Sequence, residues 1–256
     1  LTDHDDLGGL DEARRVANEK NIIFINGVEI SVTWRNRTLH IIGLDVDPKY
    51  LPLEQGLAAI RSGRVTRGSK IAAQLDKFGI QGSLEGAYCY AGEDGLIGRT
   101  HFARFFAEQG YAKNVKSVFK KYLVKGKPGY VSHQWASLND AVGWICGSGG
   151  KAVIAHPARY KLGKNLLNEL LLEFCALGGS GLEVITASHT PEQSLIFAQH
   201  ANRMNLLASC GSDFHGPGIS FRQMGQKQII PPNCKPVWEK WPDIKKLTQS
   251  NHKDIY

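Results

Sequence analysis

Residues 209–215 constrain the fold and the chemistry of this chain more than any other stretch. They follow the apolar run 206–208 and contain Asp213 and His215, two residues apart. Residues i and i+2 of an extended segment face the same side, so these side chains can reach one point beyond the end of a strand. An apolar strand that ends in such side chains is typical of the carboxyl-terminal face of a β/α barrel.

The same pattern occurs at two other places in the chain. His156 directly follows the apolar run 151–155, and His4 stands within the opening residues 1–5, which resemble the end of a strand. Two further candidates, Glu29 and His40, lie on segments 26–34 and 38–44. Antiparallel pairing across the turn at 35–37 would bring Glu29 and His40 side by side. The sequence therefore predicts several polar side chains at neighbouring strand ends.

Hydrophobic periodicity predicts the order of helices and strands. The predicted helices cover residues 8–20, 52–78, 101–109, 115–124, 137–146, 165–177 and 191–203. The predicted strands cover residues 22–25, 26–34, 38–44, 152–155, 182–185 and 206–209. Between about residue 78 and residue 145 no convincing strand is found. We therefore predict an α/β domain of residues 1–64 and 146–256 and an inserted helical cap of residues 65–145.

Composition limits the class of partner and the compartment. The net charge of +7 favours an anionic partner such as a phosphate ester or a nucleic acid. The five cysteines are scattered and form no Cys-x-x-Cys pair, which indicates reduced thiols in a cytoplasmic compartment. No apolar run approaches the roughly 18 residues of a membrane span, so we expect no membrane partner. A monomer is the favoured oligomeric state.

The polar residues at the strand ends have the donor chemistry of a metal centre. Imidazole and carboxylate groups without thiolate suit Zn²⁺, Mn²⁺ or Fe²⁺. Their number exceeds the three or four protein ligands of one catalytic zinc, which suggests two or three ions that share carboxylates. Paired ions stabilise the attacking and leaving oxygens of a phosphoryl transfer, so no Ser or Cys nucleophile is required. The candidate ligands are His4, Glu29, His40, His156, Asp213 and His215.

Basic residues near these motifs are candidate phosphate contacts. Arg159 stands three residues after His156, and Lys127 lies in the loop 126–131 of the insertion. Arg99 and His101 flank the start of a predicted helix, whose N-terminus favours anions. The predicted helix 52–78 carries a basic row that could follow a polyanion. This row consists of Arg61, Arg64 and Arg67.

Each of these residues also has a purely structural interpretation. A histidine after a strand is often a satisfied core or capping group, Glu29 can be an exposed strand residue with His40 as its cross-strand partner, and Asp213 can cap a turn. The basic row can be a solvated helix face. Only the joint arrangement at successive strand ends favours a metal centre. The histidines that keep the structural interpretation as far as metal binding is concerned are His101, His133, His189, His200 and His252.

Taken together, the motifs resemble those of the PHP (polymerase and histidinol phosphatase) superfamily. They comprise residues 2–5, 27–29, His40, 155–157 and 212–215. The interposed residues 99–104 and 121–123 narrow the resemblance. They are similar to the corresponding residues of the bacterial branch that contains nucleoside 3′,5′-bisphosphate phosphatase and a 5′→3′ exoribonuclease that trims ribosomal RNA 5′ ends.

This resemblance implies a distorted (β/α)₇ barrel with two or three metal ions, often manganese, and a cap that helps to hold the nucleotide. It implies that the six candidates above are metal ligands and that Glu29 bridges ions. We further expect Asp5 to orient His4. The expected activity is hydrolysis of 5′-phosphorylated RNA ends and nucleoside 3′,5′-bisphosphates by metal-bound hydroxide. Asp213, His215 and Arg159 are the expected catalytic residues. The expected substrate contacts are Lys127, Arg99, His101, Arg159 and Arg64.

The chain departs from the superfamily pattern at its beginning. The superfamily starts with an Asp-x-His-x-His strand and a further Asp, and these ligands are absent here. We therefore expect an N-terminal truncation of about one βα unit, on the order of 30–40 residues. The first barrel strand and part of the metal centre would then be missing, and full activity is not expected of the chain as given.

Two other functions remain open at this point. A small-molecule phosphatase such as histidinol phosphatase would use the same chemistry on a different substrate. A non-catalytic nucleic-acid-binding protein with a degenerate site would instead use the basic row. Such a protein would bind RNA with a steep salt dependence and without sensitivity to a chelator.

Overall fold

The computed structural model describes residues 1–91, 97–216, 222–226, 228–239 and 241. The chain divides into two compact units. Leu1–Gly56 and Ala136–Tyr256 form the first, here called the sheet unit, and Leu57–Trp135 form the second, here called the helical unit. No helix within these described ranges is both long enough and apolar enough to cross a membrane.

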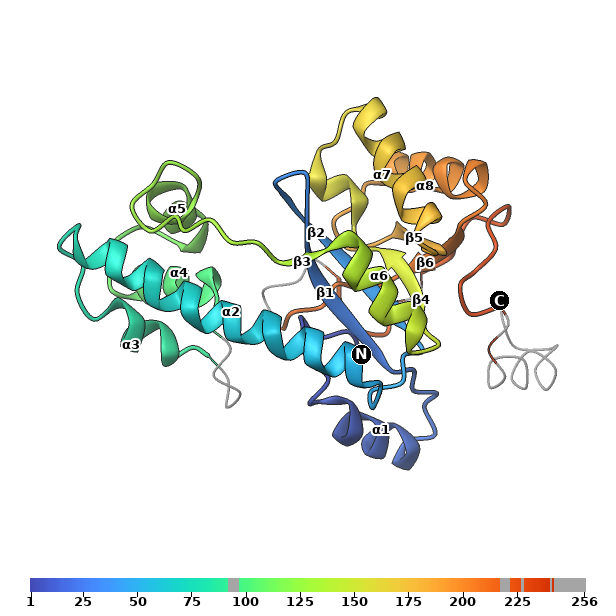
Figure 1. The fold of residues 1–256 in the computed structure, drawn as a ribbon, viewed down its shortest axis with the longest axis horizontal. Coiled ribbons are helices and arrows are strands. Elements are labelled where there is room, and N and C mark those ends of the chain that lie inside the picture. The colour runs from blue at the N-terminus through green and yellow to red at the C-terminus, as the bar shows by residue number, and fades with distance from the viewer. Residues whose placement is uncertain (92–96, 217–221, 227, 240, 242–256) are drawn as a thin grey trace. The chain divides into compact units, whose positions relative to one another are not determined.

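A six-stranded mixed sheet forms the centre of the sheet unit (Figure 1). Its spatial order is β3-β1-β2-β4-β5-β6. The strands β4, β5 and β6 run parallel to one another, whereas β2 runs antiparallel to both β1 and β4. The bounds are β1 Gly27–Trp34, β2 Arg37–Leu44, β3 Ala136–Ser137, β4 Lys151–Ile154, β5 Gly181–Ile185 and β6 Leu207–Cys210. The predicted α/β class is confirmed.

The hairpin β1–β2 sets the register that the candidate site needs. Arg35 and Asn36 form its two-residue turn, and both have positive φ, at 46° and 60°. Such primed turns match the twist of the flanking strands. The register pairs Ser31 with His40 and Glu29 with Ile42, so Glu29 and His40 are diagonal neighbours on one face.

The sheet unit also contains helices, one before β1 and the others between its later strands. They are α1 (Leu10–Glu19), α6 (Leu138–Gly147), α7 (Lys164–Ala176) and α8 (Pro191–Arg203). The hydroxyl of Ser137 caps α6 by accepting from the Asp140 amide. Thr190 and Gln193 form a reciprocal capping box at α8, with Pro191 in the first turn. These caps confirm the predicted starts of both helices.

Three details differ from the sequence-based prediction. Residues 22–25 do not form a strand. Ile22 is 61% exposed, and β1 begins only at Gly27. The two-residue strand β3 was not predicted, since it is too short to carry a periodic pattern. The helix α6, which was assigned to the insertion, contacts β1, β2 and β4 and belongs to the sheet unit. The unit boundaries therefore lie at 56/57 and 135/136 rather than at 64/65 and 145/146.

The helical unit has a hydrophobic core of its own. Its elements are the larger part of α2 (Leu51–Asp76), α3 (Ser83–Tyr88), α4 (Arg99–Glu108), α5 (Val115–Val118) and a π-helical turn Phe119–Leu123. Phe102 and Phe106 of α4 are fully buried, and the ring of Phe106 lies 5.0 Å from that of Tyr111 and 5.3 Å from that of Tyr122. The prediction of no strand between about residues 78 and 145 holds for residues 78–91 and 97–135 and is wrong at β3, Ala136–Ser137. The predicted helix 115–124 is divided between α5 and the π turn.

We predict that Phe106→Ala destabilises the helical unit by about 3–5 kcal/mol, because it removes a fully buried ring and leaves a cavity. Urea denaturation followed by circular dichroism measures the change in the free energy of unfolding. Phe78→Ala is the matched control, since the Phe78 side chain is 66% exposed. Equal losses in the two variants would contradict the assigned core.

Candidate metal centre

The carboxylate of Glu29 is the point on which the candidate ligands converge. Glu29 stands in β1 and is buried, with 6% of its surface exposed. Its Oε1 lies 2.7 Å from Nδ1 of His40 and 2.9 Å from Nε2 of His156. Its Oε2 lies 3.6 Å from Nδ1 of His4. Four of the six predicted ligands therefore form one cluster.

Backbone pairing brings His4 to this cluster. The N-terminal segment lies parallel to β1, with the Asp5 amide donating to the Glu29 carbonyl and the Glu29 amide donating to the Asp3 carbonyl, both at 2.9 Å. The buried carboxylate of Asp5 accepts from the amide of Ser31 at 2.6 Å and from its hydroxyl at 2.9 Å. Asp5 thus anchors the segment that carries His4 to the neighbouring strand.

His156 reaches the cluster from the end of β4. Ala155 continues the pairing with β2 through a bond from its amide to the His40 carbonyl, and His156 then takes φ of 27° before Pro157. A 3₁₀ turn, Pro157–Tyr160, follows. The Tyr160 hydroxyl accepts from the His40 amide at 2.8 Å, which ties the end of this turn to β2. Burial raises the pKa of Tyr160 well above its ordinary value, so the phenol stays protonated.

Asp213 and His215 follow β6, and His215 lies near His4. The imidazole of His215 lies 5.7 Å from that of His4, measured between ring centroids. The side chain of Asp213 is largely buried, its φ is 49°, and Arg159 donates a hydrogen bond to its Oδ2. Nδ1 of His215 lies 2.9 Å from the Asp213 carbonyl and 3.5 Å from Oδ1. The structure thus brings Arg159 together with Asp213, and His215 together with Asp213 and His4.

The histidines govern the ionisation of Glu29. Burial by itself would raise the pKa of Glu29. Hydrogen bonds from His156 and His40, together with the charge of His4, outweigh burial and hold the pKa well below its ordinary value. Glu29 is therefore an anion at neutral pH, which is the state that a metal ligand requires.

This donor set fits a divalent metal ion. One ligand atom from each of His4, Glu29 and His40 lies within 4.8 Å of the others. Nε2 of His156 and Nδ1 of His40 are 3.3 Å apart and both face the same carboxylate oxygen. Imidazole nitrogens around a shared carboxylate are the ligands that Mn²⁺, Fe²⁺ and Zn²⁺ accept.

A hollow of about 830 Å³ adjoins the cluster. Its polar lining includes five of the predicted ligands and one further carboxylate, namely His4, Glu29, His156, Asp213, His215 and Glu183. Apolar side chains line the remainder, among them Ile25, Ile42, Trp238 and Trp241. The hollow offers space for a small polar ligand at the candidate metal centre.

The other predicted substrate contacts lie in the helical unit. The guanidinium of Arg64 stacks over the Trp135 ring at 4.7 Å, and that of Arg67 does so at 5.5 Å. Arg67 also donates to the Val131 carbonyl. Burial, with the nearby charges of Arg99 and Arg64, lowers the pKa of Arg67 to about 10. These arginines therefore form one cluster of positive charge.

His101 and Lys127 have different surroundings within the helical unit. The Nδ1 atom of His101 accepts from the Gly98 amide at the start of α4, and burial with the charges of Arg104 and Arg64 lowers its pKa. Lys127 is exposed on a turn that its amide closes through the Val124 carbonyl.

Two side chains support the 156–160 turn, and sequence reasoning missed the role of one of them, Glu183. Glu183 of β5 is fully buried, and its Oε2 accepts from the His156 amide at 2.6 Å. Burial, with the charges of Glu29 and Asp213, raises the pKa of Glu183 to about 8, although the bond from His156 opposes this. His189, which was assigned a structural role, accepts at Nε2 from the Ala158 amide at 3.4 Å. One indication of this role was present in the sequence, because Glu183 places a carboxylate in the middle of an otherwise apolar strand.

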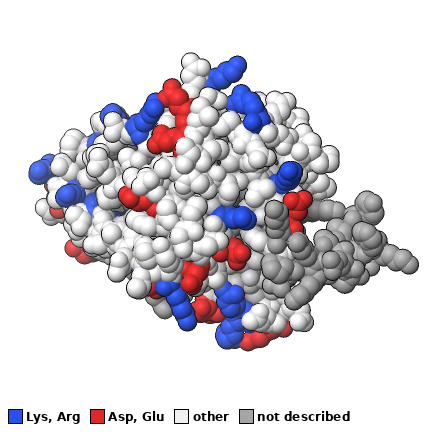
Figure 2. Space-filling view, turned by 45° about the vertical axis from the view of Figure 1, so that its right-hand side comes forward, with Lys and Arg blue, Asp and Glu red and all other residues white. Residues whose placement is uncertain are grey.

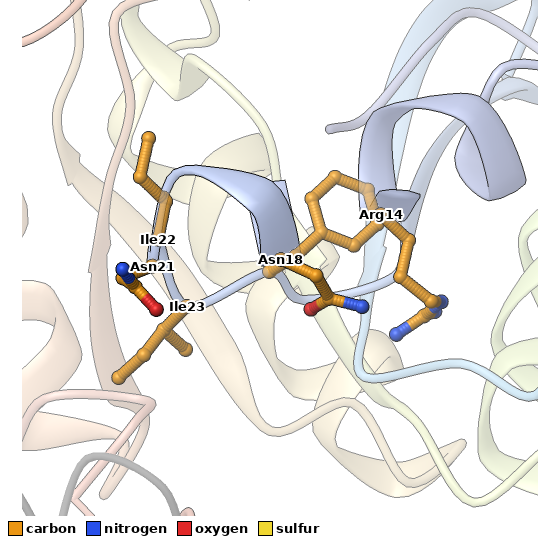
Figure 3. A pocket seen from close by; sticks show the side chains of 6 residues that line it. Arg14, Asn18, Asn21, Ile22 and Ile23 are labelled. Atoms are coloured by element: carbon orange, nitrogen blue, oxygen red, sulfur yellow. The ribbon is translucent and has the colours of Figure 1, made fainter. Parts of the chain in front are cut away.

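A second hollow, of about 370 Å³, lies beside α1 (Figure 3). Its six lining residues include neither a histidine nor a carboxylate; they are Arg14, Asn18, Asn21, Ile22, Ile23 and Phe24. Arg14 donates a hydrogen bond to Oδ1 of Asn26, and its guanidinium carbon lies 5.2 Å from the centroid of the Phe24 ring. This hollow therefore lacks the donor chemistry of the Glu29 cluster.

Known proteins resemble the chain in sequence. No family model matches it. The 3′,5′-nucleoside bisphosphate phosphatase of Chromobacterium violaceum is 51% identical over 238 residues, covering 93% of this chain and 84% of the relative. The 5′-3′ exoribonuclease Rnm of Salmonella typhimurium is 39% identical over 243 residues, covering 94% of this chain and 82% of the relative.

Solved structures agree with these relatives. An amidohydrolase from Chromobacterium violaceum, with bound sulfate and no metal, has a TM-score of 0.88 at 50% identity and covers 93% of this chain and 83% of its own. A protein from Bifidobacterium adolescentis described as a metal-dependent phosphoesterase has a TM-score of 0.73 at 25% identity and covers 92% and 81%. The chain therefore belongs to the family of bacterial phosphoesterases that contains 3′,5′-nucleoside bisphosphate phosphatase and the 5′-3′ exoribonuclease Rnm, and the resemblance to the PHP superfamily is confirmed.

Proposed function

We propose that this chain is a metal-dependent phosphoesterase that hydrolyses nucleoside 3′,5′-bisphosphates and removes nucleotides from 5′-phosphorylated RNA ends. The observation that carries the proposal is the convergence of His4, His40 and His156 on the buried carboxylate of Glu29. The names of the family members support the substrate class. Two relatives with these two activities point to one chemistry on a 5′-terminal nucleotide.

Divalent ions are the proposed cofactors, two or three in number and manganese foremost, with zinc or iron as alternatives. The proposed ligands are His4, Glu29, His40, His156, Asp213 and His215, with Glu29 shared between ions. The Bifidobacterium neighbour described as metal-dependent supports the use of a metal. When bound, such ions lower the pKa of water and neutralise charge on a phosphoryl group.

Arg159 is the proposed phosphate contact at this centre. Its guanidinium is bound to Asp213, yet its side chain remains 44% exposed. A guanidinium offers five donors, so Arg159 can hold Asp213 and a phosphate oxygen together. Asp213 and His215 complete the proposed catalytic group.

The helical unit is the proposed cap, and its arginine cluster is the proposed second contact for the substrate. Arg64 stacked on Trp135 combines a cation with an aromatic face, which are the groups that bind phosphate and nucleobase. Arg99, His101 and Lys127 are proposed to assist Arg64. The parallel arrangement of β4, β5 and β6, with intervening helices, supports the distorted (β/α)₇ barrel as the proposed fold of the sheet unit.

A non-catalytic nucleic-acid-binding protein with a degenerate site would use the basic row Arg61, Arg64 and Arg67. On the face shown in Figure 2, Lys and Arg side chains are interspersed with Asp and Glu side chains and leave a wide uncharged area. The Glu29 cluster provides donors suited to hydrolysis, which a protein that only binds nucleic acid does not need. The observations therefore favour the enzyme.

We expect Asp213→Ala to reduce phosphate release from a nucleoside 3′,5′-bisphosphate by more than about 100-fold. Groups that only support a ligand cost 10–100-fold when they are removed, and a direct ligand should cost more. The assay supplies Mn²⁺ and compares this variant with Asp11→Ala, which changes an exposed carboxylate in the first turn of α1. Retention of turnover by Asp213→Ala would refute the assigned site.

We expect Arg64→Ala to raise KM for a nucleoside 3′,5′-bisphosphate by about 10–100-fold, the equivalent of losing one charged hydrogen bond of about 1.5–3 kcal/mol. Its kcat should change much less, because Arg64 is assigned to binding. Arg15→Ala serves as the control, since Arg15 forms an exposed pair with Glu19. An unchanged KM in Arg64→Ala would remove the arginine cluster from the substrate site.

A further inference from the structure

Glu183 is a buried carboxylate beside the metal centre to which the proposed reaction assigns no role. It stands in β5, is 3% exposed, and lines the hollow that contains the Glu29 cluster. Its Oε2 accepts a hydrogen bond of 2.6 Å from the amide of His156. This bond connects Glu183 to a proposed ligand through the backbone rather than through the imidazole.

The backbone that Glu183 holds is in an unfavourable conformation. His156 has φ of 27° and ψ of 58°, in the left-handed region that residues with a Cβ rarely occupy. Pro157 adds a steric demand on the residue before it, which normally drives that residue to an extended conformation. Such a conformation persists only where the surroundings enforce it. In an extended conformation, His156 would no longer present Nε2 to Glu29.

The carboxylate of Glu183 has little freedom to move. A Cβ built on Gly211 would lie 2.7 Å from its Oε1, so the carboxylate fits between the His156 amide and the bare Cα of Gly211. The register of β5 with β6 shifts between Glu183 and Ile185, and the Gly211 amide donates to the Ile185 carbonyl. This irregularity fixes the direction of Glu183.

We propose that Glu183 is a positioning residue that keeps the left-handed turn at His156 and so directs Nε2 of His156 to the ion shared with Glu29. The inference rests on the proposed function, because it assumes that His156 is a ligand. Glu183 acts as a hydrogen-bond acceptor for the backbone, and Gly211 leaves the space that this acceptor needs.

The test compares Glu183→Ala with Glu183→Gln, in which the amide oxygen can still accept from His156. Titration with Mn²⁺ alone, followed by electron paramagnetic resonance of the free ion, gives the metal affinity. Glu183→Ala should weaken Mn²⁺ binding by about 10–100-fold, and Glu183→Gln should restore most of the loss. Glu169→Gln, which alters an exposed ion pair with Arg35, should bind Mn²⁺ like the parent chain.

Gly211→Ala provides an independent test that leaves Glu183 in place. The added methyl should displace the carboxylate and reproduce the loss of Mn²⁺ affinity. In hydrolysis of a nucleoside 3′,5′-bisphosphate, Glu183→Ala and Gly211→Ala should lower kcat while KM stays within about twofold. If Glu183→Ala does not fold, Gly211→Ala and Glu183→Gln still decide the matter.

Two results would overturn the proposal. Equal losses of Mn²⁺ affinity in Glu183→Gln and Glu183→Ala would mean that the carboxylate itself contacts the ion or the substrate. Parent-like Mn²⁺ binding in both Glu183→Ala and Gly211→Ala would mean that the turn at His156 needs no support from Glu183. Because Mn²⁺ binding is measured without substrate, predicted Mn²⁺ affinities with no hydrolysis by the parent chain would refute the proposed function alone. Failure of the parent chain to bind Mn²⁺ would refute the positioning role as well.

Discussion

The burial of one charged carboxylate, that of Glu29, is the constraint on which the candidate site depends. A buried anion is stable only when it is paired and hydrogen-bonded, and Glu29 meets that condition through His40 and His156, with His4 close to its other oxygen. These three histidines come from the N-terminal segment, from β2 and from the end of β4. One carboxylate therefore links separate parts of the chain at one point of the sheet.

The backbone around this point is strained where it has to turn. Asp5, His156 and Asp213 all have positive φ, at 55°, 27° and 49°. Residues with a Cβ rarely take this conformation, and it persists only where surrounding contacts impose it. Here the contacts are the bonds of Asp5 to Ser31, of Glu183 to the His156 amide, and of Arg159 to Asp213. The backbone that carries the proposed ligands is thus held by carboxylates that accept hydrogen bonds from a backbone amide or from a guanidinium.

Much of this site could be predicted from sequence because it follows local patterns. His156 and Asp213 stand two and three residues after the ends of β4 and β6, and Glu29 and His40 lie on the two strands of a hairpin with a recognisable turn. Three-dimensional pairing was needed for the rest. The role of Glu183 depends on a backbone amide 27 residues away, which no spacing rule reveals. The strand predicted at residues 22–25 was wrong because an apolar run with β-branched residues has the pattern of a strand whether or not a sheet partner exists.

The most direct test of the central claim is a crystal of this protein soaked in Mn²⁺, with diffraction data collected at the manganese absorption edge. The account predicts an anomalous peak within bonding distance of a Glu29 carboxylate oxygen and of at least one nitrogen from His4, His40 or His156. Absence of a peak there, with Mn²⁺ bound elsewhere or nowhere, would contradict a metal centre built on Glu29.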